Sequence, residues 1–271
     1  MAVTTAPSVP ASAAPPGPVR PAPPPPPRYR VGDLENSGTV RTESVDADRW
    51  TARGLVKVTG DASIGEGTVE GTVTVGGKLT ANALLYRGTV DVEGAVDVGG
   101  TITGSGSFRA GQTFHAGDAD LKGTVRAVGA TSVDRALAVR GSLAAPSLKS
   151  ETFTLEGDAE IPGDLAGTTV SARLTADSTF GTVRARSVTL RARGPNLVEM
   201  FFWNRVHVNV DRIEADTVEL EGVEAKFVHA PEITLGRHAH VTQYEGTIVK
   251  RHPTSRVGYE SKSRPPYGLR R

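Results

Sequence analysis

The sequence predicts an all-β fold, a single-stranded β-helix (β-solenoid) with a triangular cross-section. First, apolar residues recur in i, i+2 pairs at steps of five or six residues, and such pairs share one face of a strand. Second, glycine repeats every six residues through the middle of the chain. Third, aromatic residues make up only 5% of the chain, which suits a narrow core filled by small side chains. A repeat of this kind defines the architecture.

The six-residue block predicts the coil most directly. Val90 and Val92 are followed by Val96 and Val98, with Gly94 between the two pairs. Each unit is expected to be a strand of two to four residues followed by a corner. Glycine is expected to supply the positive φ of that corner. Three units then make one coil of about 18 residues.

The five-residue blocks flank this region, and their corners should be one residue tighter. They begin near Val40 and again near Ile213. No helical stripe has a period of five or six residues. A β-sandwich would need longer strands and less even spacing. Both alternatives therefore fit less well than the solenoid.

Three regions follow from the composition. Residues 1–32 form a Pro-rich arm, expected to be disordered, which is either a solvated linker or a docking peptide. Residues 33–250 form the solenoid, and residues 251–271 form a basic tail that is also expected to be disordered. The repeat becomes irregular at 149–163 and again at 193–205.

The ends of the solenoid and its second irregular segment are the candidate self-association sites. A solenoid end exposes unpaired strand edges and an uncapped core, so it is either capped or stacked on another copy. Trp50 could plug the first coil, whereas no bulky cap follows Ile248. The segment 193–205 holds the densest apolar cluster, which is core or cap packing, a protein contact, or a contact with a ligand or lipid. The candidate self-association residues are Trp50, Phe201, Phe202, Trp203 and Ile248.

A second candidate surface is the basic end of the chain. The formal net charge is only +1, so contact with a membrane or nucleic acid must come from a local patch. We expect either a solvated terminus or an anchor for an anionic surface. Its candidate residues are Lys250, Arg251, Arg256, Lys262, Arg264, Arg270 and Arg271.

The sequence predicts no catalytic, cofactor-binding or metal site. It has no cysteine, so thiolate metal sites and disulfides are excluded. His238 and His240 could share a strand face, but no third ligand is evident at useful spacing. Asp118 and Asp120 lie near His115 in sequence and are expected to be solvated charges. There is no signal peptide pattern and no apolar stretch of about 18 residues that could cross a bilayer.

Four segments resemble a known family. They are Ile213–Val223, Ala230–Gly236, Val241–Val249 and the Gly-Thr-Val-x-Val-x-Gly unit at Gly88–Gly94. Together they resemble the coils of bactofilin-type, polymer-forming cytoskeletal proteins. The resemblance implies a right-handed β-helix that self-assembles without nucleotide into filaments or sheets. It also implies a cytoplasmic scaffold, at the inner membrane face or with cell-envelope proteins, and makes nucleic acid an unexpected partner.

Two other functions stay open at this point. A non-polymerising binding or adhesion module could use the same solenoid. A hexapeptide-repeat acyltransferase would share the six-residue repeat and would need a catalytic histidine. His115 is the only histidine in the six-residue block. The structural role is preferred, and the chain is not expected to be an enzyme.

Overall fold

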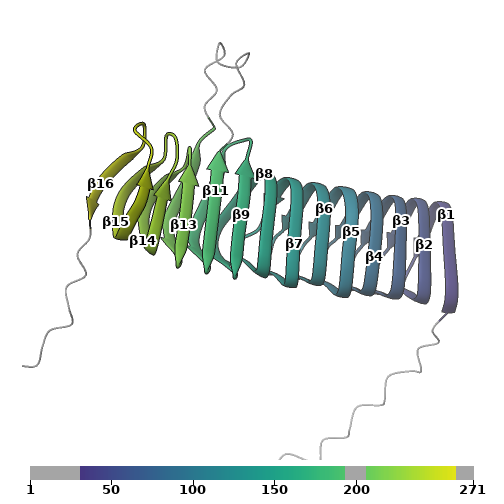
Figure 1. Ribbon diagram of the computed structural model, residues 1–271. Coiled ribbons are helices and arrows are strands. Elements are labelled where there is room, and N and C mark those ends of the chain that lie inside the picture. The colour runs from purple at the N-terminus through teal and green to yellow at the C-terminus, as the bar shows by residue number, and fades with distance from the viewer. Residues whose placement is uncertain (1–30, 193–205, 261–271) are drawn as a thin grey trace, which may run out of the picture.

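The computed structural model describes residues 31–192 and 206–260, and every regular element in these stretches is a β-strand. The strands pair in parallel and stack along one axis, with β1 and β16 at opposite ends of the molecule (Figure 1). The predicted all-β solenoid is therefore confirmed.

The first eight strands each follow most of one coil. They are β1 (Val31–Thr42), β2 (Val45–Val58), β3 (Ala62–Val75), β4 (Leu79–Val92), β5 (Val96–Ala110), β6 (Phe114–Ala127), β7 (Thr131–Ala144) and β8 (Leu148–Ala166). Later coils are divided into shorter strands. They are β9 (Thr169–Leu174), β10 (Ser178–Arg184), β11 (Ser187–Ala192), β12 (Val208–Glu214), β13 (Thr217–Glu221), β14 (Glu224–Leu235), β15 (His240–Arg251) and β16 (Arg256–Glu260).

Strand length is where the sequence-based prediction was wrong. Strands of two to four residues were expected, but β1 to β8 contain 12 to 19 residues. The reason is that the hydrogen-bond ladder between coils continues around the corners. In the pair β3 and β4, for example, register holds from Ala62 beside Leu79 to Val75 beside Val92.

Coil length varies from one part of the stack to another. Gly71 lies beside Gly88, 17 residues further on, and Gly88 lies beside Gly106, a step of 18. Near the C-terminus Thr217 lies beside Glu232, a step of 15 residues. This agrees with a coil made of three five-residue repeats. The expected irregularity at 149–163 is mild. Strand β8 runs through it, with a register shift against β10.

One hydrophobic core runs through the described stack. The paired residues of the repeat point inward, and Val90, Val92, Val96 and Val98 are all buried. Three aromatic rings stack in the middle of this core. The ring centroids of Tyr86 and Phe108 lie 5.7 Å apart, and those of Phe108 and Phe114 lie 5.1 Å apart. The long axis is therefore held together by contacts between successive coils.

One corner of the coil is a column of glycines with positive φ. Each glycine lies beside the next one in register, and at Gly123, for example, φ is 109°. A Cβ on Gly123 would collide with the carbonyl oxygen of Gly106 in the coil before. The column consists of Gly38, Gly54, Gly71, Gly88, Gly106, Gly123, Gly141 and Gly157.

Most glycines at the other corners do not have the positive φ that was expected of them. Gly65, Gly100 and Gly117 lie at another corner without it. A Cβ on Gly100 would instead meet the carbonyl oxygen of Asn82 in the preceding coil. These three glycines allow close approach of backbones without a positive φ. Outside the column corner, Gly246 beside Ala230 does have one, with φ of 132°.

The described stack is slightly longer than the predicted solenoid. Strand β1 starts at Val31, and β16 pairs in parallel with β15, placing Arg256 beside His240. Residues 256–260, which the composition assigned to the tail, therefore form the last strand of the stack.

Candidate self-association ends

The N-terminal end of the stack is an open edge. Within the described residues β1 pairs only with β2. Leu34 and Val40 point toward the core above Trp50 and Val56 but are only half-buried. An edge strand offers unpaired N–H and C=O groups. This end therefore presents both backbone groups and apolar side chains to a further coil.

The C-terminal end is open over most of its last full coil. Strand β16 covers β15 only from His240 to Tyr244, so 245–251 have β14 alone as a strand neighbour among the described residues. Ile248 lies beside Ile233 and is half-buried against the core, as are Tyr244 and Val257. The two open ends face away from each other along the stack (Figure 1).

The residues predicted for self-association have different positions. Trp50 is 1% exposed, covered by β1, and its indole Nε1 donates a 2.7 Å hydrogen bond to Asn36 Oδ1. It is therefore a core residue of the second coil and does not cover the open end. Ile248 does lie at an open end. Phe201, Phe202 and Trp203 lie outside the described residues.

The sequence missed Leu34, Val40, Tyr244 and Val257 as residues of the open ends. They lie at an open end only because their coils are the first and the last of the described stack, and the sequence pattern does not show where the stack begins and ends. The usable signal was the glycine column, because Gly38 beside Gly54 marks one coil before the coil that contains Trp50.

The predicted anionic-surface residues are described only in part. Lys250 and Arg251 lie at the end of β15, and Arg256 begins β16. All three are exposed. Lys262, Arg264, Arg270 and Arg271 lie outside the described residues.

A row of alternating charges crosses four coils at His115. Lys78 Nζ lies 2.9 Å from Asp97 Oδ2, and His115 Nδ1 lies 3.1 Å from Asp97 Oδ1. His115 Nε2 lies 3.2 Å from Asp134 Oδ1. The hydrogen bond to Asp97, with a further contribution from Asp134, raises the pKa of His115. Lys78 and then His115 lower the pKa of Asp97.

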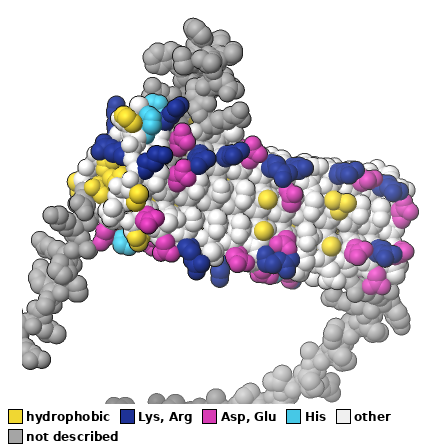
Figure 2. Space-filling view, viewed as in Figure 1, with side chains coloured by type: hydrophobic (Ala, Val, Ile, Leu, Met, Phe, Trp, Pro, Cys, Tyr) yellow, Lys and Arg dark blue, Asp and Glu magenta, His cyan; other side chains and the backbone are white. Residues whose placement is uncertain are grey.

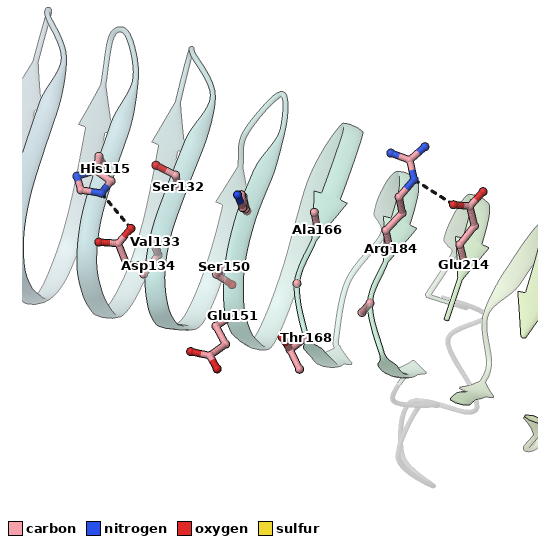
Figure 3. Close-up of a pocket in the computed structure, with 13 residues that line it drawn as sticks. His115, Ser132, Val133, Asp134, Ser150, Glu151, Ala166, Thr168, Arg184 and Glu214 are labelled. Carbon is pink, nitrogen blue, oxygen red and sulfur yellow. Dashed lines mark hydrogen bonds and ion pairs between the residues drawn. The ribbon is translucent and has the colours of Figure 1, made fainter. Parts of the chain in front are cut away.

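This row lies at one end of a shallow groove of about 860 Å³, shown in Figure 3. Ser132, Lys149, Glu151 and Thr168 line its middle, and Arg184 closes the far side. The guanidinium of Arg184 contacts the carboxylates of Asp164 and Glu214 at 3.2 and 3.0 Å. Since both ring nitrogens of His115 already contact carboxylates, neither is left to accept a proton from a hydroxyl in the groove.

The other polar clusters of the sequence do not converge. Asp118 contacts Arg135, whereas Asp120 contacts Arg140. His238 is in a turn with φ of 54°, and His240 of β15 contacts Glu224 of β14. Among residues 31–192 and 206–260, no three His, Asp or Glu side chains are arranged to hold a metal ion.

The fold defines the class as a β-solenoid, and within residues 31–192 and 206–260 no further strand covers β1 or the end of β15. A scan against protein-family models, a search of curated proteins and a search of solved structures all found no match. Within its described part, the chain has no helix long and apolar enough to span a membrane.

Proposed function

We propose that this protein is a structural scaffold that assembles with copies of itself, without nucleotide, through the open ends of its β-solenoid. This is the role of the bactofilin-type proteins that its coils resemble, and the right-handed winding of that family belongs to the proposal. The observation that carries it is that neither end is capped among the described residues.

Stacking would satisfy both kinds of group that the ends expose. The backbone groups of β1 and of residues 245–251 would continue the parallel ladder of the stack. Half-buried Leu34, Val40 and Ile248 would become core residues. Apolar burial and completed backbone hydrogen bonds both favour such contact.

The proposed place of action is the cytoplasm, at the inner membrane face or beside cell-envelope proteins. A filament there would hold partners at fixed positions without performing chemistry. We propose no cofactor and no enzymatic role, in line with the engagement of both nitrogens of His115 by carboxylates.

Light scattering and negative-stain electron microscopy of the full chain at tens of micromolar test this proposal. Wild type should form filaments or sheets. Ile248→Glu should weaken assembly, because it places a charge in the core column of an open end. Val249→Glu is the matched control, since Val249 is 64% exposed and adjacent in sequence.

A second pair tests the other end. Leu34→Glu should weaken assembly, whereas Thr39→Glu on the same strand should not, because Thr39 is exposed. A strictly monomeric wild type would refute the proposal, and a stable complex with a different protein would then favour the binding module. Acyl transfer lost in His115→Ala would instead establish the enzyme.

A further inference from the structure

The charged residues of the central coils are segregated around the cross-section. Strands β4 to β7, residues 79–144, contain six Lys or Arg and six Asp or Glu, so this part has no net charge. Five of the six cations nevertheless lie along the glycine corner. We call these five the basic ridge. They are Arg87, Arg109, Lys122, Arg126 and Arg140.

Coil register places these cations in two parallel rows. Arg87, Lys122 and Arg140 each precede a glycine of the column, in register with Ser105. Arg109 and Arg126 pair with each other, three residues after their glycines. Between the rows runs an uncharged line of hydroxyl side chains, Thr89, Ser107, Thr124 and Ser142.

The ridge cations are exposed and few of them are engaged. Arg109 and Arg140 contact carboxylates only at 3.8 and 3.7 Å. Arg87, Lys122 and Arg126 form no ion pair with another described residue. Figure 2 shows Lys and Arg side chains recurring along the upper edge of the stack. Two acids of these coils lie beside the ridge cations, Asp91 next to Arg109 and Asp120 next to Arg140.

Most acids of these coils already contact a basic side chain, and Asp97, Asp118 and Asp134 lie on a different part of the coil from the ridge. Asp97 and Asp134 contact His115, Asp118 contacts Arg135, and Asp120 contacts Arg140. A second copy of this chain could therefore offer the ridge few unpaired carboxylates from these coils. This argues against another subunit as the partner of the ridge.

We infer that the basic ridge is a docking surface for an anionic lipid bilayer, with the long axis of the solenoid lying along the membrane plane. The ridge is a convex corner, and the groove of Figure 3 lies elsewhere, on the strand face of His115 and Ser132. A convex row of cations can touch a plane along its whole length, whereas none of the described residues beside it would enclose a polymer chain. The ridge has no aromatic side chain on which a nucleobase could stack.

The expected binding is peripheral and sensitive to salt. Each Lys or Arg close to an anionic bilayer strengthens binding roughly fivefold, and the effect decays within a Debye length. The inference rests on the proposed function only for multivalent binding, because end-to-end stacking would align the ridges of many copies along one membrane. A single chain already presents all five cations.

Co-sedimentation with vesicles tests the inference. The full chain should bind vesicles of phosphatidylglycerol and phosphatidylcholine in equal parts and not vesicles of phosphatidylcholine alone. The combined variant Arg87→Gln, Lys122→Gln and Arg126→Gln should lower the affinity on the order of 100-fold at low salt.

The control variant combines Lys78→Gln, Arg135→Gln and Lys149→Gln. It removes the same charge from outside the ridge and should retain most of the binding. Equal losses in the two variants, or none in the ridge variant, would overturn the inference. So would binding of double-stranded DNA through the ridge without binding of vesicles.

Assembly measured without vesicles separates this inference from the proposed function. The ridge variant should form the same filaments as wild type, since its substitutions are far from both ends. If neither protein assembles but vesicle binding still depends on the ridge, only the proposed function fails. If assembly without vesicles is lost in the ridge variant alone, the ridge is a contact between copies and the inference fails.

Discussion

Replacing a single glycine of the column should destabilise the protein strongly. In Gly123→Ala the new Cβ meets the carbonyl oxygen of Gly106, which is backbone in an adjacent coil and has little room to move. The φ of 109° adds strain that an L side chain does not tolerate well. Strain of about 1–3 kcal/mol and a crowding cost of about 1–3 kcal/mol give a loss of about 2–5 kcal/mol in unfolding free energy.

Urea unfolding followed by circular dichroism, at a concentration below assembly, measures this loss. Gly99→Ala is the matched control, because a Cβ there has no atom within 4 Å and Gly99 has no positive φ. Its unfolding free energy should change by less than about 0.5 kcal/mol or rise slightly. Similar losses at Gly99 and Gly123 would refute this reasoning, because neither the contact with the Gly106 carbonyl nor the positive φ would then explain the effect.

Two further predictions concern polar groups inside and outside the core. The buried hydroxyl of Tyr86 has no hydrogen-bond partner among the residues that the structure describes, and burial raises its pKa. Tyr86→Phe should therefore leave the unfolding free energy unchanged or raise it by up to about 1 kcal/mol in urea titrations. A loss above that size would mean that the hydroxyl is satisfied in solution. Because Asp97 and Asp134 raise the pKa of His115, the charged imidazole stabilises the folded state below the ordinary histidine value of about 6.5, and this stabilisation disappears as pH rises through the raised folded pKa. The difference in unfolding free energy between wild type and His115→Gln should therefore be larger near pH 6 than at about pH 8.5, and a flat difference would contradict the assignment.

The inward residues of the solenoid could be predicted because their pattern is local. Val90 and Val92 form a pair on one strand face, and the same pair is buried in the structure. Alternation along a strand follows from backbone geometry alone. It does not depend on where the next coil begins.

Strand lengths and corner types could not be read in the same way. Gly100 and Gly106 look alike in sequence, yet only Gly106 has a positive φ. The difference is set by the backbone of the neighbouring coil. Likewise, strands continue around corners because the neighbouring coil completes their hydrogen bonds, which is a tertiary effect.

The alignment of the ridge cations could not be predicted from the sequence for a related reason. Arg87 and Lys122 are 35 positions apart in sequence but belong to the same row, since coils of 18 and 17 residues separate them. An error of one residue in either coil would move a side chain to the opposite face. Net charge, near zero overall, gave no indication of this segregation.

The register of the glycine column also makes the length of this molecule adjustable in whole units. Gly71 and Gly88 occupy equivalent places in successive coils, so deleting 72–88 would join Gly71 to Thr89 in a position that Gly88 already fills. The solenoid would shorten by one coil, about 4.8 Å, and both ends would keep their surfaces. Duplication or deletion of about 17 codons would therefore change the length of the solenoid by one coil, while the two coil ends proposed to contact other copies would stay the same.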